Sequence, residues 1–101
     1  MLEIVREIEA TASTSGCTIH LPIDGIVAEQ FAANAPSRQV MLSDGLSDAE
    51  MMLDIGAQTL ASFGQVIDKA NTVLWNGPMG AFELAGFDQG TYQLARHVAA
   101  K

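Results

Sequence analysis

The residues best suited to chemistry lie in one short stretch, from Asn76 to Glu83, which directly follows the apolar run Thr72–Trp75. This stretch holds an amide, two glycines, a proline and a carboxylate. In an open parallel sheet, ligands bind beyond the carboxyl ends of the strands, where the backbone turns and its free amides point at them. The pattern therefore predicts a strand over Thr72–Trp75 that ends in a loop for a phosphate or another ligand.

Asn76-Gly77 also allows an alternative, because this dipeptide favours a type I′ turn between two antiparallel strands. Pro78 argues against a hairpin, and the chain after it has helical rather than alternating spacing. Apolar positions predict a last helix that ends near residue 100: Leu84, Phe87, Leu94 and Val98. We therefore favour strand, loop and helix, with Glu83 in the first turn of that helix, where the helix dipole favours a carboxylate.

Hydrophobic spacing predicts the elements that must position this loop. In chain order they are a helix from Met1 to about Ser13, a strand at Cys17–Leu21, a strand at Gln39–Leu42 and a helix from about Ala57 to Ala70. Residues 24–33 suit a strand at first and a helical turn later, and we favour a short extended piece that runs into a turn. Ser47 and Glu50 match a capping box, which predicts a helical turn over residues 47–53.

Strands that alternate with helices predict an α/β fold with a parallel sheet. Only three or four strands and three helices are evident in the 101 residues, whereas a parallel sheet needs helices on both faces. We therefore expect a partial Rossmann-like parallel sheet with flanking helices, an incomplete three-layer α/β/α domain. The first helix starts without a capping residue, so we expect a fragment of something larger. The exposed sheet edges favour self-association.

Charge and composition limit the classes of partner. Five lysines and arginines against twelve aspartates and glutamates give a net charge of −7. This acidity excludes nucleic acid and anionic membrane surfaces, although backbone amides can still bind a phosphate-bearing ligand. No apolar run approaches the roughly 20 residues that span a bilayer, and the acidic start is unlike a signal peptide. With a single cysteine no internal disulfide can form, and we expect a cytoplasmic protein.

Other candidates for chemistry are interpreted as structural. Asp54 is interpreted as a helix-entry cap rather than a metal ligand, and Cys17 as a small buried hydrophobe. His20 and His97 have no acidic or cysteine partner at metal-ligand spacing, so no metal ligand is identified in the chain. Trp75 is interpreted as an aromatic packed under a sheet edge rather than as a ligand contact. No nucleophile–base pair is visible.

The run Trp75–Glu83 resembles the signature of the phosphoglycerate kinase family. Further runs resemble other segments of that family in the same order: Leu21-Pro22-Ile23-Asp24 followed by Val27-Ala28, then Leu53-Asp54-Ile55-Gly56, and after the signature Phe87 with Gly90-Thr91. These motifs spread over nearly the whole chain, which makes the resemblance specific. It implies that residues 1–101 are part of the family's carboxyl-terminal, nucleotide-binding domain, without its amino-terminal substrate domain.

The resemblance also implies an activity and a site. The family transfers a phosphoryl group between 1,3-bisphosphoglycerate and ADP, giving 3-phosphoglycerate and ATP in glycolysis, with Mg²⁺ on the nucleotide. By position, Glu83 would hold the ribose hydroxyls and Asn76 would approach the phosphates. The remaining contacts would come from Pro78, Gly80 and Ala81 along the ribose and base, and from Leu53 against the adenine. Carboxylates accept hydrogen bonds from hydroxyls and glycines permit close approach, so these residue types suit the task.

The chain departs from the family's pattern at Met52, where glycine is common, and at Ala57, where proline is common. The family's glycine-rich segments for phosphate and magnesium are also absent. The resemblance therefore implies that 3-phosphoglycerate is bound only by the missing domain and that the chain is inactive alone. Two alternatives stay open. One is a non-enzymatic nucleotide-binding or self-associating module built from this half-domain, and the other is a structural fragment without nucleotide affinity.

Overall fold

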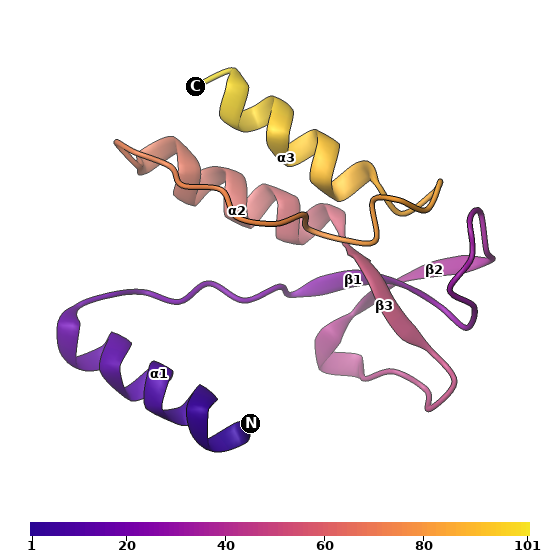
Figure 1. Cartoon of the computed structure of the whole chain (residues 1–101), viewed down its shortest axis with the longest axis horizontal. Helices are drawn as coiled ribbons and strands as arrows, with labels where there is room; N and C mark the ends of the chain where they lie inside the picture. The colour runs from indigo at the N-terminus through magenta and orange to yellow at the C-terminus, as the bar shows by residue number, and fades with distance from the viewer.

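A computed structural model describes all residues from Met1 to Lys101. The helices are α1 (Leu2–Ser15), α2 (Ala57–Lys69) and α3 (Gln89–Ala99); the strands are β1 (Asp24–Ala28), β2 (Ser37–Met41) and β3 (Met51–Ile55); and a 3-10 helix, η1, spans Leu42–Asp44. Helices α2 and α3 lie side by side next to the sheet, whereas α1 lies apart from both (Figure 1). The predicted mixture of helices and strands is therefore confirmed.

The three strands form one sheet in the order β2-β1-β3, and both strand pairs are antiparallel. The register places Asp24 opposite Met41 and Ala28 opposite Ser37. The predicted Rossmann-like parallel sheet is therefore not what these strands form. For β1 and β2 the reason lies in the connection 29–36, which is shorter than the dozen or so residues that a parallel crossover needs.

Two predicted strands, Cys17–Leu21 and Thr72–Trp75, belong to no sheet. Both run as extended chain (Figure 1). Their β-branched and apolar residues favour an extended backbone, but within this chain no strand lies beside them to pair with. Cys17 is consequently exposed rather than buried, so its interpretation as a buried hydrophobe is wrong.

The remaining boundaries test the hydrophobic spacing directly. The first two predicted helices are confirmed as α1 and α2, the strand near Gln39 as β2, and the extended piece at the start of residues 24–33 as β1. The helical turn predicted at residues 47–53 is wrong, because that apolar run enters β3. Short apolar runs fit a strand or a buried helix equally, and pairing with β1 decides the matter here. Helix α3 begins only at Gln89, since Leu84 and Phe87 lie in turns.

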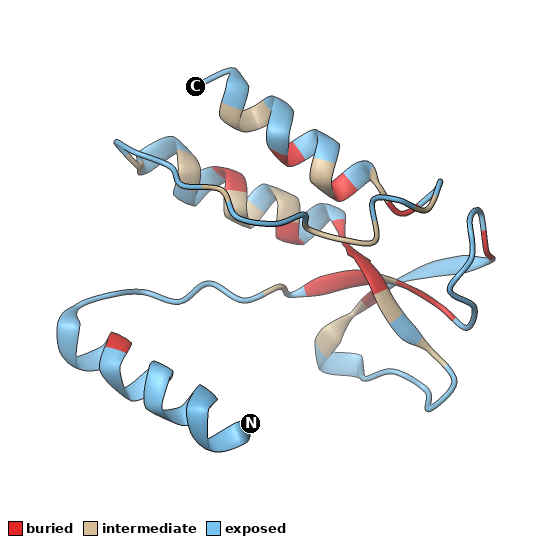
Figure 2. Cartoon of the chain, in the orientation of Figure 1, coloured by how far each residue is buried: buried red, intermediate tan, exposed pale blue.

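The hydrophobic core is small and lies where the sheet meets the turns before α3. Its members are Ala28, Ala35, Leu53 and Phe87, with Ile26, Ala81 and Leu84 packed against them. Buried residues gather in β1, β3 and the facing turns of α2 and α3, whereas α1 is exposed except at Ala12 (Figure 2). No hydrogen bond joins residues 1–22 to residues 23–101. None of the helices has the length and hydropathy needed to cross a membrane.

Asp24, at the start of β1, fixes α2 to the sheet. Its carboxylate is fully buried and accepts hydrogen bonds from the backbone N–H groups of Gln58 at 3.0 Å and Thr59 at 2.8 Å. The Thr59 hydroxyl donates at 2.6 Å and the Gln39 side-chain amide at 2.8 Å. Burial by itself would raise the pKa of Asp24, but these hydrogen bonds lower it below its ordinary value. Asp24 therefore caps the free amides of α2 from another element.

Candidate functional site

A cavity of about 420 Å³ opens between β3, the loop after β1 and residues 78–81. Its lining is mostly apolar and consists of Phe31, Met52, Leu53, Asp54, Pro78, Met79, Gly80 and Ala81. The structure thus brings together four of the six residues that the sequence assigned to a nucleotide: Leu53, Pro78, Gly80 and Ala81. A mostly apolar cavity with few polar groups suits a flat organic ring better than a bare phosphate.

Two backbone hydrogen bonds hold the loop 78–81 in place over the cavity. The Ala81 N–H donates to the Leu53 carbonyl oxygen at 2.7 Å, which ties the loop to β3. The Met79 N–H donates to the Thr91 hydroxyl oxygen at 3.0 Å, which ties it to α3. The loop is therefore held by a strand on one side and by a helix on the other.

Gly80 lies so close to β3 that no side chain fits. A Cβ atom at this position would lie 2.6 Å from the Leu53 carbonyl oxygen and 2.8 Å from the Cα atom of Asp54. The loop therefore needs a glycine here to reach the strand, which is the close approach that glycine permits. The turn before it needs a glycine for another reason, because Gly77 has a φ of 87° and therefore a left-handed backbone.

Asp54 forms the floor beneath this loop and is 3% exposed. One carboxylate oxygen accepts the Ile55 N–H at 2.8 Å and the other accepts the Gly90 N–H at 2.9 Å. Burial raises the pKa of Asp54, the hydrogen bonds from Gly90 and Ile55 offset this only in part, and the charge of Asp88 raises it further. The interpretation of Asp54 as the cap at the entrance of the helix that begins at Ala57 is wrong, because Gly56 is the N-cap of α2 and Asp54 instead accepts the Gly90 N–H in the first turn of α3.

Asn76 and Glu83 are exposed, and neither lines the cavity. Glu83 was expected in the first turn of the last helix, but it lies in a turn before Gln89, where α3 begins. That expectation is wrong because the apolar positions after Glu83 pack on the core from turns rather than from a helix. The two side chains are attached to the cavity loop but are not placed in its wall.

Trp75 begins the loop and is the only tryptophan in the chain. Its indole N–H donates to the Gly77 carbonyl oxygen. The ring lines an apolar hollow together with side chains of α2 and α3, among them Phe63 and Leu94. Trp75 therefore packs, as the sequence indicated, but against helices rather than under a sheet edge.

Phe31 lines the cavity and was missed by the sequence analysis. Its side chain is 58% exposed, and it follows directly after β1 and its turn. A large aromatic directly after the polar pair Glu29-Gln30 is the signal that could have identified it, because binding residues are concentrated in loops. Hydrophobic periodicity cannot identify Phe31, because a single apolar residue in a loop forms no repeating pattern.

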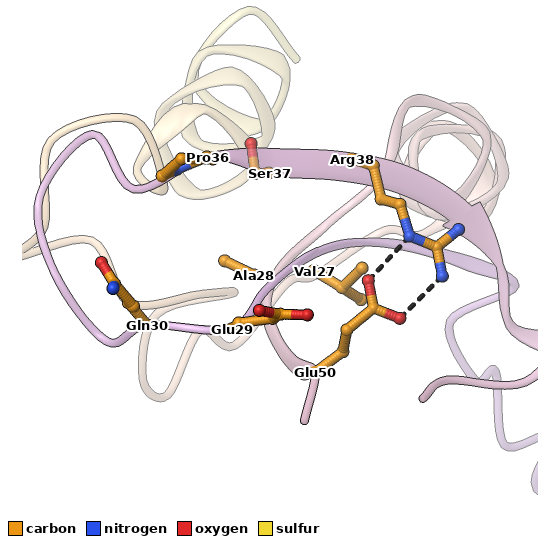
Figure 3. Close-up of a pocket in the computed structure, with 8 residues that line it drawn as sticks. All are labelled: Val27, Ala28, Glu29, Gln30, Pro36, Ser37, Arg38 and Glu50. Atoms are coloured by element: carbon orange, nitrogen blue, oxygen red, sulfur yellow. Dashed lines mark hydrogen bonds and ion pairs between the residues drawn. The ribbon is translucent and has the colours of Figure 1, made fainter. Parts of the chain in front are cut away.

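A second cavity, of about 350 Å³, lies at the loop end of the β1–β2 hairpin (Figure 3). Its charged groups satisfy one another, because the Arg38 guanidinium donates to both carboxylate oxygens of Glu50, each at 2.7 Å. Arg38 thereby lowers the pKa of Glu50 to about 2. Glu50 also accepts the Ser47 N–H at 3.1 Å, the contact of a capping box, although a strand follows rather than a helix. None of the predicted site residues lines this cavity.

Comparisons with known proteins agree with one another. The sequence profile of the family described as phosphoglycerate kinase matches residues 1–101. The phosphoglycerate kinase of Xanthobacter autotrophicus is 46% identical over 101 residues, which are 100% of this chain and 25% of that protein. The phosphoglycerate kinase of Zymomonas mobilis is 45% identical over 98 residues, 97% of this chain and 24% of that protein. The chain thus spans about a quarter of the length of these relatives.

Solved structures give the same result. The structure of phosphoglycerate kinase from Coxiella burnetii superimposes with a TM-score of 0.92 at 32% identity and covers 99% of this chain and 26% of that one. The crystal structure of phosphoglycerate kinase from Pyrococcus horikoshii gives a TM-score of 0.75 at 25% identity, covering 97% of this chain and 24% of that one. The chain therefore belongs to the phosphoglycerate kinase family.

Proposed function

We propose that residues 1–101 are part of the carboxyl-terminal, nucleotide-binding domain of a phosphoglycerate kinase, and that the cavity beneath the loop 78–81 holds the adenine and ribose of ADP or ATP. The observation that carries this proposal is the shared lining by Leu53, Pro78, Gly80 and Ala81. Phe31 and Pro78 are both exposed at this cavity, so a flat ring can lie against them.

Asn76 and Glu83 take the polar parts of the nucleotide in this proposal. Both are exposed on the loop that carries Pro78 and Gly80, so their side chains are free to meet a ligand. Glu83 accepts hydrogen bonds from the two ribose hydroxyls, and the Asn76 amide donates to a phosphate without adding charge. Because both side chains are exposed, they can reach the nucleotide by side-chain movement alone, without exposing any buried group.

For the whole protein we infer the family's reaction, in which a phosphoryl group passes between 1,3-bisphosphoglycerate and ADP to give 3-phosphoglycerate and ATP in glycolysis, in the cytoplasm. Phosphoryl transfer depends on positioning both substrates and on neutralising the charge of the moving group. This chain contributes the positioning of the nucleotide's ribose and base. 3-Phosphoglycerate is assigned to the rest of the protein, and the chain alone is expected to be inactive.

The residues of this chain do not fit a resident magnesium site. Mg²⁺ demands near-octahedral oxygen ligands, and no three or more His, Cys, Asp and Glu side chains gather to hold a metal ion. Both oxygens of buried Asp54 already accept backbone N–H groups. In the whole enzyme we assign Mg²⁺ to the nucleotide that it accompanies and its protein ligands to other segments.

The unpaired segments Cys17–Leu21 and Thr72–Trp75 support a proposal about the sheet. In the whole protein they would pair with further strands and complete a Rossmann-like parallel sheet of the three-layer α/β/α kind. In the chain alone, these segments and the exposed apolar face of α1 favour self-association, which makes a non-enzymatic, self-associating module the second candidate function. Analytical ultracentrifugation tests this point, and a clean monomer at every concentration would contradict it.

The main proposal is tested by grafting residues 1–101 in place of the matching quarter of the Zymomonas mobilis kinase. In the graft, Glu83→Ala should raise the KM for ADP about tenfold, because hydrogen bonds to a charged group are strong, and should leave the KM for 3-phosphoglycerate nearly unchanged. Glu29→Ala, which removes an exposed carboxylate outside the cavity, is the control. Equal effects of Glu83→Ala on both substrates would refute the ribose assignment.

Calorimetric titration of the chain itself with Mg-ADP gives a second test. We expect weak or undetectable binding, because only the ribose and base side of the site is attributed to these residues. Submicromolar affinity would show that the absent segments contribute less than we propose.

A further inference from the structure

The nucleotide proposal gives no task to Asp54, one of only two buried acidic residues in the chain. We propose that Asp54 is a positioning residue for the nucleotide cavity, because its carboxylate sets the loop 78–81 and the start of α3 in a fixed register on β3. This inference rests on the proposed nucleotide function, because positioning the loop matters for binding only if the cavity holds a nucleotide. The contacts from which it is argued are present without any ligand.

The first route from Asp54 to the cavity passes through α3. The Ile55 N–H donates to one carboxylate oxygen at 2.8 Å and fixes the orientation of the group, while the Gly90 N–H donates to the other at 2.9 Å and holds the first turn of α3. The next residue of that turn, Thr91, accepts the Met79 N–H at 3.0 Å. A shift of the Asp54 carboxylate therefore reaches Met79, a wall of the cavity, through one helical turn.

The second route is direct. Gly80 packs on the carboxylate so closely that a Cβ atom there would lie 2.5 Å from the Asp54 oxygen Oδ1. The neighbouring Ala81 N–H donates to the Leu53 carbonyl oxygen at 2.7 Å, so the loop cannot lift at Gly80 without straining that bond. Both routes end on residues 79–81, which line the cavity.

The position needs a carboxylate rather than another small polar group. Two backbone N–H donors, from Ile55 and Gly90, face Asp54, and a carboxylate offers two acceptor oxygens. An amide offers one oxygen and one NH₂ group, so Asp54→Asn turns one of the two hydrogen bonds into a contact between donors. Because the site is buried, the displaced partner finds no water in its place.

The experiment compares Asp54→Asn with Gln39→Ala, both in the 101-residue chain and in its graft into the Zymomonas mobilis kinase. Gln39→Ala is the matched control, because it also removes one hydrogen bond to a buried carboxylate, that of Asp24, but does so far along the chain from the loop. Two readouts are taken on folded protein: ADP affinity from titration of the graft, and, in the chain alone, the emission maximum and iodide quenching of Trp75, whose indole N–H donates to Gly77 in the loop. Urea unfolding of each variant supplies the stability.

We expect Asp54→Asn to weaken ADP binding about tenfold and to make Trp75 more accessible to iodide, whereas Gln39→Ala changes neither while lowering stability by a similar amount. Gly80→Ala, which pushes the loop off an intact Asp54, should reproduce the Asp54→Asn result and covers the case in which Asp54→Asn does not fold. Equal behaviour of Asp54→Asn and Gln39→Ala in both readouts would overturn the positioning role. If the unmutated graft binds no ADP, the nucleotide function fails, and the Trp75 readout in the chain alone still decides whether Asp54 positions the loop.

Discussion

The two buried carboxylates, Asp24 and Asp54, hold equivalent places and are tuned in opposite directions. Each lies in a strand and caps the helix packed beside it, Asp24 for α2 and Asp54 for α3. Asp24 accepts side-chain donors as well as backbone N–H groups and has a lowered pKa, whereas Asp54 accepts two backbone N–H groups and has a raised pKa. Burial opposes ionisation at both sites; the hydrogen bonds outweigh it at Asp24 but not at Asp54, where the charge of Asp88 also raises the pKa.

The opposite pKa shifts distinguish Asp24, which joins α2 to the sheet, from Asp54, which joins α3 to the sheet beside the candidate site. The carboxylate with many donors joins α2 to the sheet and does not line the cavity. The carboxylate with few donors lies against Gly80 and lines the cavity. Buried ionisable groups with a shifted pKa are common where function is located, because function there sets requirements that stability does not.

The largest effect on this comparison should come from Asp24→Asn. One oxygen is replaced by an NH₂ group that faces the N–H groups of Gln58 or Thr59, so a buried donor loses its partner. We expect the free energy of unfolding to fall by about 3 kcal/mol, in the range measured when one partner of a buried charged network is removed. Urea unfolding followed by circular dichroism measures it, with the exposed Asp44→Asn as control. If Asp24→Asn lowers the free energy of unfolding no more than Asp54→Asn does, the number of hydrogen-bond donors does not determine which carboxylate stabilises the fold more.

The sequence predicts part of this arrangement. The stripe of Leu60, Phe63 and Ile67 predicts α2, and the residue types from Asn76 to Glu83 single out the cavity loop. Periodicity carries no information about strand direction, so the antiparallel pairing of β1 was not predicted. Asp24 was not predicted as a cap either, because it and Thr59 are separated by 35 residues and local capping rules do not reach that far.

The Asp54 junction is tested next by Gly90→Ala at the start of α3. A Cβ atom at Gly90 would overlap the Asp54 carboxylate and lie 2.7 Å from the Ile55 side chain, so α3 must move away from the sheet. We expect a loss of about 2 kcal/mol in the free energy of unfolding, as for other overpacked sites. Gly64→Ala in α2 is the matched control, because the nearest atom there, 3.2 Å away, belongs to the His97 ring, which is partly exposed and can give way.

In Gly64→Ala the gain in helix propensity, about 1 kcal/mol, should largely offset any crowding. If both variants lose stability equally, the loss reflects helix glycines in general rather than the Asp54 junction. Thermal unfolding of the two variants side by side distinguishes these results.

The opposite pKa shifts predict opposite pH dependences. Asp24 has a lowered folded-state pKa, so the stability it contributes is present above about pH 4, the pKa of an unfolded aspartate, and is lost as the pH falls through the folded-state pKa. Asp54 has a raised folded-state pKa, so ionisation disfavours the folded state at neutral pH, and this penalty is relieved as the pH falls through that pKa towards about 4.

The stability difference between the wild type and Asp24→Asn should therefore shrink on acidification, and the difference between the wild type and Asp54→Asn should grow. Urea unfolding at a series of pH values below neutrality measures both. Slopes of the same sign would contradict the contrast between the two carboxylates.

The smallest effect on stability should come from Arg38→Ala, which tests whether a strong hydrogen-bond donor stabilises the fold when the donor itself is exposed. Arg38 donates to both oxygens of Glu50, and these hydrogen bonds are the main cause that lowers the pKa of Glu50 to about 2. Yet the Arg38 side chain is 58% exposed, so water and salt screen the attraction. Removing Arg38 should raise the pKa of Glu50 towards the ordinary range in an NMR titration while changing the urea midpoint little more than Arg6→Ala on exposed α1. A loss of stability that matches Asp24→Asn would mean that charged donors, and not burial, make the two strand carboxylates important.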